Sequence, residues 1–251
     1  MNATDSPTPL ESEKTTLREE THRRLIQLGV TDDPPGRIPS FSGEGQAAEQ
    51  LRRLEPYRAA RVVFCAPDSV LRQVRINALV DGKRLITATP ALKSGLVEIT
   101  RSSLPPWKFA WALSGEGLRQ HGRQLTLARR DAGNPIVDVL ITGAVAVDAN
   151  GGRLGKGAGY FDLEFALFAA AGWIDPAVCV AAVVHQHQVI NHVPMAAHDV
   201  PVDLIITPQQ VIVTSRSGPR SAQLTPSLLT RRAASLPIVR AALAQFAGHN
   251  P

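Results

Sequence analysis

The chain has 251 residues, of which 44% are hydrophobic, and its formal net charge at pH 7 is +5. These values suit one main α/β domain with a large buried core, and no stretch is apolar for long enough to predict a membrane-spanning helix. The polar, acidic N-terminus and the two cysteines argue against a secretory signal and a disulfide framework, so we expect a cytoplasmic protein with buried free thiols.

The N-terminal part predicts two helices separated by a loop. We expect residues 1–13 to be disordered. Leucines spaced among charged residues then predict an amphipathic helix over residues 14–28, ended by a glycine. Residues 31–45 are dense in Pro, Gly and Ser and predict a loop. A second helix is expected over residues 46–54, where Pro56 stops it.

From residue 61 onward, apolar segments alternate with helical or loop segments. The apolar segments are continuous runs of Val, Ile, Leu and Ala, a pattern typical of strands that are covered on both faces. The predicted strands span residues 61–66, 84–89, 137–147, 178–185 and 203–207, with a return strand at 211–214. The predicted crossover helices span residues 69–80 and 163–172. We therefore predict an α/β fold with a layered, mostly parallel sheet over residues 14–214.

Residues 215–251 are predicted to form a basic C-terminal extension with one or two helices. No acidic residue follows Asp203, whereas five arginines do, and they equal the whole net charge. These are Arg216, Arg220, Arg231, Arg232 and Arg240. Only one aromatic residue, Phe246, accompanies them, and no nucleic-acid-binding motif is present. A solvated or partner-facing extension is therefore favoured over nucleic-acid binding.

The segment from Asp148 to Leu167 is the most informative for function. Alternating glycines at positions 155–159 let backbone N–H groups converge on an anion, and Arg153 and Lys156 add positive charge. A helix beginning near Tyr160 would direct its positive end at the same anion. The loop is not a P-loop, because a glycine follows Lys156 where Ser or Thr is needed, and it is not the dinucleotide-binding fingerprint. A loop that only turns the chain is the alternative interpretation.

Acidic residues near this loop indicate a magnesium site. Asp162 directly follows the glycines, and a carboxylate beside bound phosphates calls for a bridging cation such as Mg²⁺. Asp199 and Asp203 flank the start of a later predicted strand, and we expect one of them to complete the site. For Asp203, capping of the strand edge is an equally good interpretation.

Histidines and tryptophans give weaker signals. Four histidines lie between His185 and His198, but no cysteine is close and no zinc-binding spacing is present, so we expect them to line a cleft, pack or be solvated. Trp107 and Trp111 are four residues apart, and packing in the core is favoured over covering a flat ligand ring.

Three blocks of the sequence, in the same order, resemble the 5-formyltetrahydrofolate cyclo-ligase family, also called methenyltetrahydrofolate synthetase. The run from Arg153 to Asp162 is similar to the family's R-L-G-x-G-x-G-Y-[YF]-D signature. The segment from Lys14 to Arg18 resembles its N-terminal K-x-x-[LI]-R block. A further block is matched by Gln188, Pro194, His198, Asp199 and Asp203.

The resemblance implies a fold of the sugar-isomerase and CoA-transferase type (NagB/RpiA-like), with ATP and Mg²⁺ as cofactors. It implies that ATP phosphorylates the formyl oxygen of 5-formyltetrahydrofolate, after which a folate nitrogen attacks the activated carbon and phosphate leaves. The implied metal ligands are Asp162 and Asp199, and the implied catalytic groups are Arg153, Lys156 and Tyr160. The implied nucleotide-binding residues are Lys14, Arg18, Arg153, Leu154, Gly155, Lys156, Gly157, Ala158, Gly159 and Tyr160.

Residues 66–96 depart from the family pattern. Typical members carry an acidic segment there, with a glutamate that contacts the folate, whereas this chain offers Asp68 and Asp81. This stretch is more similar to the divergent methenyltetrahydrofolate synthetase domain-containing branch. Two alternatives therefore stay open: a nucleotide-binding member that acts on another substrate, and a non-catalytic nucleotide- or RNA-associated protein. We expect a reduced folate as the small-molecule partner, no membrane partner, and a monomer or weak homo-oligomer.

Overall fold

The computed structural model describes residues 8–128, 136–216 and 231–246, together with residues 218, 220 and 224. Its helices are α1 (Pro9–Gln27), α2 (Glu44–Arg53), α3 (Glu55–Ala59), α4 (Arg72–Val80), α5 (Phe109–Ala112), α6 (Gly115–His121), α7 (Tyr160–Ala171), α8 (Arg231–Ala234) and α9 (Pro237–Phe246). Single 3₁₀ turns are η1 (Ser69–Leu71), η2 (Pro90–Leu92), η3 (Arg101–Ser103), η4 (Pro106–Lys108) and η5 (Gln186–Gln188). No helix in the described ranges is long and apolar enough to cross a membrane.

An eight-stranded sheet in the order β11-β10-β8-β5-β1-β2-β3-β4 forms the middle layer. Its parallel centre consists of β10 (Leu204–Ile206), β8 (Cys179–Val183), β5 (Val139–Gly143), β1 (Val62–Cys65) and β2 (Arg84–Ala88). The antiparallel edge strands are β11 (Val211–Val213) on one side and β3 (Leu96–Ile99) and β4 (Arg123–Leu125) on the other. This arrangement confirms the predicted α/β class with a mostly parallel sheet.

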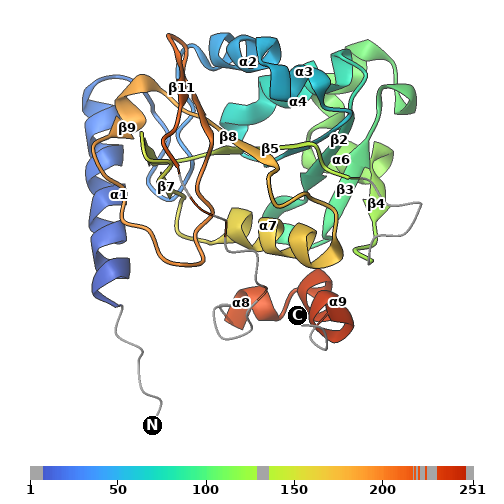
Figure 1. Ribbon diagram of the computed structural model, residues 1–251. Helices are drawn as coiled ribbons and strands as arrows, with labels where there is room; N and C mark the ends of the chain where they lie inside the picture. Colours follow the sequence, from blue (N-terminus) through green and yellow to red (C-terminus); the bar gives the residue numbers. More distant parts are fainter. Residues whose placement is uncertain are drawn as a thin grey trace.

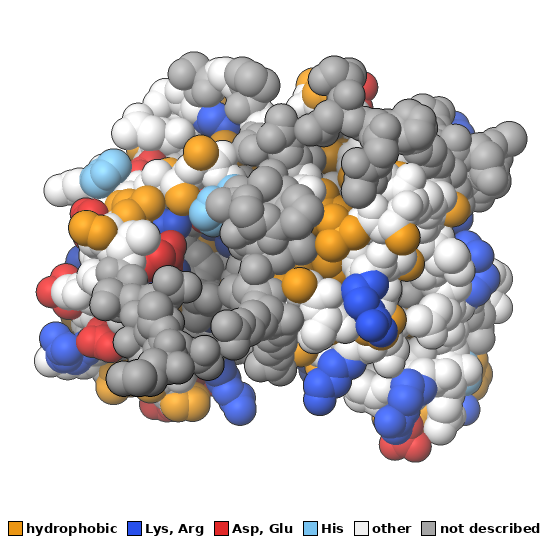
Figure 2. All heavy atoms as spheres, turned by 90° about the horizontal axis from the view of Figure 1, so that it is seen from below, with side chains coloured by type: hydrophobic (Ala, Val, Ile, Leu, Met, Phe, Trp, Pro, Cys, Tyr) orange, Lys and Arg blue, Asp and Glu red, His pale blue; other side chains and the backbone are white. Residues whose placement is uncertain are grey.

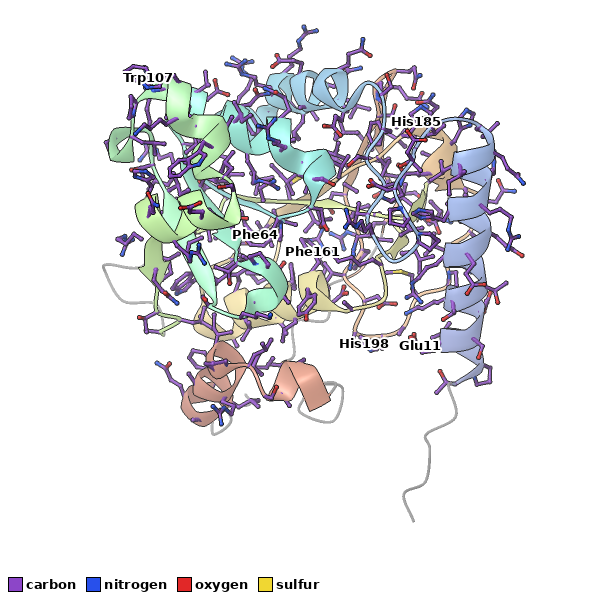
Figure 3. All side chains as sticks on the ribbon, turned by 180° about the vertical axis from the view of Figure 1, so that it is seen from behind. Glu11, Phe64, Trp107, Phe161, His185 and His198 are labelled. Atoms are coloured by element: carbon purple, nitrogen blue, oxygen red, sulfur yellow. The ribbon has the colours of Figure 1, made fainter. Side chains whose placement is uncertain are left out.

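Helices cover both faces of this sheet, which explains why its central strands are apolar without alternation. Figure 1 shows α2, α3 and α4 on one face and α7 on the other, with α8 and α9 beyond α7. Every residue of β1 and of β5 is buried. Phe64 of β1 and Phe161 of α7 face each other with their ring centroids 6.4 Å apart (Figure 3). This contact fixes the first turn of α7 against the sheet.

The predicted strand over residues 137–147 is in fact two strands in two sheets. The chain leaves the main sheet after Gly143, and β6 (Ala146–Asp148) joins a small sheet with β7 (Arg153–Leu154) and β9 (Val189–Ile190). A side chain at position 143 is sterically excluded, because a Cβ there would lie 2.6 Å from Cγ2 of Ile38. The apolar run continues through this bend, so periodicity alone did not reveal it.

The first helix starts earlier than residue 14. Thr8 caps it, since its hydroxyl accepts a hydrogen bond from the Glu11 N–H at 3.2 Å, and Pro9 occupies the first turn. The predicted disorder of residues 1–13 therefore does not hold for residues 9–13, and residues 1–7 lie outside the described part of the chain.

Parts of the predicted C-terminal extension pack on the domain. The buried guanidinium of Arg220 donates to the backbone oxygens of Val178 and Pro201 and pairs with Asp203, and Arg216 also pairs with Asp203 at 2.8 Å. Helix α9 buries Val239 and Ala242 and lies against α7 (Figure 1). These two arginines and this helix thus belong to the folded body rather than to a solvated tail.

Candidate active site

A cavity of about 260 Å³ opens where three neighbouring parallel strands end. Its wall combines residues 66–68 after β1, residues 89, 91 and 92 after β2 and residues 142–143 at the end of β5 with residues 155, 156, 158 and 159 of the glycine loop and the first turns of α7. The carboxyl ends of parallel strands are where open α/β sheets bind their ligands. The glycine loop predicted to bind phosphate thus forms one side of a ligand-sized cavity.

The backbone of the glycine loop is shaped for an anion. Gly157 and Gly159 have φ values of +95° and +65°, in the left-handed region that favours glycine, and α7 begins at the next residue. Within the described chain, no backbone N–H group from Lys156 to Asp162 donates a hydrogen bond. These N–H groups and the positive end of α7 are therefore free to bind a negatively charged group.

Cationic side chains surround this loop, but each already has a partner. Arg18 donates from Nε to the backbone oxygen of Gly155 at 2.9 Å, and its guanidinium lies beside Gly157. Lys156 pairs with Asp68, with 2.6 Å between Nζ and Oδ1. Lys14 is buried and pairs with Asp199 at 2.5 Å, so it reaches the carboxylate predicted to bind metal rather than the loop itself.

Arg153 is held firmly in the cavity wall. Its Nε donates to the backbone oxygen of Val200 at 3.2 Å, one terminal nitrogen pairs with Asp162, and the guanidinium covers the Phe161 ring at 4.7 Å. Its other terminal nitrogen lies beside Gly155, 3.2 Å from where a Cβ would be. Arg153 is thus pre-positioned with one N–H edge directed at the loop.

The two predicted metal ligands are linked through the backbone next to Asp199, but only Asp162 lines the cavity, and Asp199 lines a different pocket. The N–H of Val200, which directly follows Asp199, donates to Oδ1 of Asp162 at 2.8 Å. Oδ2 of Asp199 accepts from Lys14 and from the Ala196 N–H. Each carboxylate keeps a second oxygen without a hydrogen bond in the described chain. Because Mg²⁺ typically takes one or two carboxylates together with phosphate oxygens, these residues fit that ion.

No ready-made cluster of metal ligands exists, however. Among the described residues, no group of three or more His, Cys, Asp or Glu side chains is arranged to hold a metal. Asp162 and Asp199 supply two carboxylates at most, so a divalent ion there depends on ligand oxygens for the rest of its shell.

Glu164 is a residue that sequence reasoning missed. Its side chain lies on α7, is 2% exposed, and lines the cavity. Burial raises the pKa of this carboxyl well above its ordinary value, and the negative charge of Asp68 raises it further. The available signal was a single acid inside the otherwise apolar run from Leu163 to Ala171.

A strained turn forms another part of the wall. Ala91 and Leu92 both have positive φ values, 55° and 54°, which is rare for residues other than glycine. Thr89 fixes this turn, since its hydroxyl donates to the Gly95 oxygen at 3.0 Å and accepts from the Ser94 N–H at 3.0 Å. Such strain is found most often at ligand sites.

Other residues singled out from the sequence lie away from the cavity. Asp203 accepts from the Val180 N–H and pairs with two arginines, so strand-edge capping describes its position. Trp107 is 81% exposed, which contradicts the prediction that it packs in the core, and Figure 3 shows it far from Phe161. His198 is partly exposed near Glu11, and His185 accepts a hydrogen bond from the His187 N–H (Figure 3).

The fold and the cavity define an α/β protein with an anion-binding glycine loop at the carboxyl edge of its sheet. A sequence model of the 5-formyltetrahydrofolate cyclo-ligase family matches residues 11–208, and the chain belongs to this family. It is 33% identical to the methenyltetrahydrofolate synthase domain-containing protein of Bos taurus over 238 residues, which is 90% of this chain and 61% of that protein. The corresponding mouse protein, from Mus musculus, is 33% identical over 82% of this chain and 56% of its own length.

Other relatives match less of the chain or share less of its sequence. The 5-formyltetrahydrofolate cyclo-ligase of Mycolicibacterium smegmatis is 37% identical over 32% of this chain and 38% of its own. The solved structure of Aquifex aeolicus 5,10-methenyltetrahydrofolate synthetase covers 85% of this chain and 100% of its own, with 19% identity and a TM-score of 0.48. The chain spans about three fifths of the length of the Bos taurus relative.

Proposed function

We propose that this protein is an ATP- and Mg²⁺-dependent cyclo-ligase that converts 5-formyltetrahydrofolate to 5,10-methenyltetrahydrofolate, with release of ADP and phosphate. The observation that carries the proposal is the set of free backbone N–H groups from Lys156 to Asp162, which border the cavity in a chain of this family. In this reaction the formyl oxygen takes the γ-phosphoryl group of ATP and leaves with it as phosphate when the folate nitrogen attacks the formyl carbon.

The residues of the site have roles that suit phosphoryl transfer. The loop N–H groups and the positive end of α7 would bind the phosphates, and Lys156 would exchange Asp68 for a phosphate oxygen. Arg153 would present its free N–H edge at the loop while Asp162 and Val200 hold the other side of the guanidinium. Phosphoryl transfer needs positioning and charge neutralisation more than a nucleophilic side chain, and this chain supplies both.

Asp162 and Asp199 are the residues that would hold Mg²⁺, each through its remaining carboxylate oxygen. The ion would supply further neutralisation of the phosphate charge. Lys14 keeps Asp199 in place through their 2.5 Å ion pair. Tyr160 lines the cavity and Arg18 donates to the Gly155 oxygen of the loop, so both would limit the access of water to the loop.

The proposal is tested by mixing the purified protein with ATP, Mg²⁺ and 5-formyltetrahydrofolate and following the absorbance of the methenyl product. The methenyl product must form only when ATP and 5-formyltetrahydrofolate are both present, and Lys156→Ala must slow its formation. ATP binding without product would reject the cyclo-ligase reaction. It would then favour the alternative of a nucleotide-binding member with another substrate. That alternative is motivated by residues 66–96, which depart from the family pattern and include residues that line the cavity, such as Asp68 and Leu92.

A nucleic-acid-associated function receives less support. Arg216 and Arg220 from the basic C-terminal segment are already paired with Asp203. On the face seen in Figure 2, the described Lys and Arg side chains form small groups toward the lower and right edges, with uncharged or acidic side chains beside them.

A further inference from the structure

Glu164 is buried without the partners that other buried acids of this protein have. Glu98 is 5% exposed and pairs with Arg84 and Arg123, each at 2.6 Å. Asp148 is 2% exposed and accepts hydrogen bonds from the backbone N–H groups of residues 150, 152 and 193. Glu164 is 2% exposed, and within the described chain nothing donates a hydrogen bond to it or forms an ion pair with it. A buried carboxyl without a hydrogen-bond partner costs free energy, and a partner that enters the cavity from outside the chain would remove that cost.

A ligand in the cavity is in the right place to be that partner, because Glu164 lines the cavity. The same wall carries Asp68, whose only described ion-pair partner is Lys156, whereas Arg153 and Asp162 balance each other. Neither Asp68 nor Glu164 offers phosphate groups the positive charge or the converging donors that the free N–H groups of the glycine loop provide. The nucleotide phosphates and the second substrate consequently belong to different parts of the site.

The chemistry of the remaining wall narrows the class of ligand. Ile38, Leu92 and Phe161 give the cavity apolar sides, which favour the uncharged body of a ring. A carboxyl group has two oxygens, and its best neutral partner is a group with two adjacent N–H donors. A ring N–H next to an exocyclic amino group, as on a reduced pterin, is such a group.

We propose that Glu164 is a specificity-determining residue, which selects the second substrate through hydrogen bonds between its carboxyl group and adjacent N–H donors of a nitrogen heterocycle. This inference rests on the proposed cyclo-ligase function and assigns the residue that recognises the second substrate of that reaction. It also accounts for an acid inside the apolar first turns of α7, where a leucine would pack without cost.

The test combines protein variants with a ligand that lacks one donor. Binding of 5-formyltetrahydrofolate and of its 2-desamino analogue is measured by calorimetry, with Mg²⁺ and a non-hydrolysable ATP analogue present, for the wild type, Glu164→Gln and Glu164→Leu. The wild type must bind the desamino analogue on the order of tenfold to a hundredfold more weakly. Glu164→Leu must bind both folates equally weakly, while its affinity for the ATP analogue stays the same.

Thermal unfolding separates recognition from a structural role. Glu164→Leu removes an unpartnered buried acid, so its Tm must rise, by roughly 2–4 °C for a chain of this length. The matched control is Glu98→Gln, in which a buried and fully paired acid is changed: its Tm must fall while folate binding is unchanged.

Three results would overturn the inference, and they differ in what else they reject. Suppose that the wild type turns over 5-formyltetrahydrofolate but Glu164→Leu still prefers 5-formyltetrahydrofolate to the desamino analogue by the same factor. Glu164 then does not recognise the substrate, and the proposed function stands. A fall in Tm for Glu164→Leu with unchanged folate binding would likewise show that Glu164 has a structural role and does not recognise the substrate, and the proposed function would again stand. If the wild type binds no 5-formyltetrahydrofolate, both the proposed function and this inference fail.

Discussion

The ion pair between Lys156 and Asp68 gives the sharpest prediction about nucleotide binding. The lysine must leave Asp68 before it can contact a phosphate, and the Asp68 carboxylate then repels the phosphates. Asp68→Asn removes both the free energy needed to break this ion pair and the repulsion between the carboxylate and the phosphates. The pair is partly exposed, with 34% of the Lys156 side chain and 14% of the Asp68 side chain accessible, so its own strength is small. Together with the lost repulsion we expect a gain of about 1–2 kcal/mol, or roughly 5- to 30-fold tighter ATP binding.

Lys156→Ala should act in the opposite direction. It removes a charge-assisted contact with phosphate worth about 1–3 kcal/mol, so ATP binding should weaken roughly 5- to 150-fold. In the double variant, Asp68→Asn should gain less than in the wild type, because no lysine is left to release.

The assay is calorimetric titration with a non-hydrolysable ATP analogue and Mg²⁺ for the four members of this cycle. Asp81→Asn is the matched control, since Asp81 also pairs with a cation, Arg52 at 2.5 Å, but does not line the cavity. Weaker ATP binding by Asp68→Asn, or an equal gain in both backgrounds, would refute the idea that Asp68 and phosphate compete for Lys156.

Three further variants test the metal ligand, a glycine and an arginine. Asp162→Asn should raise the Mg²⁺ concentration needed for half-maximal turnover, and an unchanged magnesium titration would show that this carboxylate is not a ligand. Gly152→Ala should lower the free energy of unfolding in urea by about 2–4 kcal/mol, because the new Cβ would lie 2.4 Å from Oδ2 of the buried Asp148. Arg220→Ala should lower the free energy of unfolding in the same assay by about 2–3 kcal/mol, because two backbone oxygens lose their donor and Asp203 keeps only one of its two arginines. The exposed Arg240→Ala should change this free energy by about 0.5 kcal/mol or less, and equal effects of the two variants would contradict the packing described for Arg220.

The central strands and the glycine loop could be predicted because their signals are local. A strand buried on both faces is a continuous apolar run, as in β1 and β8, and a turn with positive φ requires glycine, as at Gly157 and Gly159. The edge strand β11 was predicted as well, whereas β3 and β4 at the other edge were missed because they lack such a local signal. Strand β3 contains Glu98, which is buried only because two arginines from neighbouring strands reach it, and no window of sequence reveals that arrangement.

The partners of the site residues could not be read from the sequence. Arg153 and Asp162 are both in the recognisable loop motif, yet their pairing with each other depends on the bend between β7 and α7. Lys14 and Asp199 are 185 positions apart in the chain, and their contact exists only because α1 packs beside the segment before β10. That Glu164 lines the cavity could not be predicted either, because the cavity is formed by segments that lie far apart in the sequence.

The way Arg220 is anchored has a practical consequence for anyone who shortens this protein. A chain cut after β11 would keep every strand of the main sheet. It would nevertheless strip the donor from the Val178 carbonyl and uncover the face of α7 on which α9 rests. Loss of activity in such a truncated protein would therefore report a damaged scaffold and would say nothing about a regulatory tail.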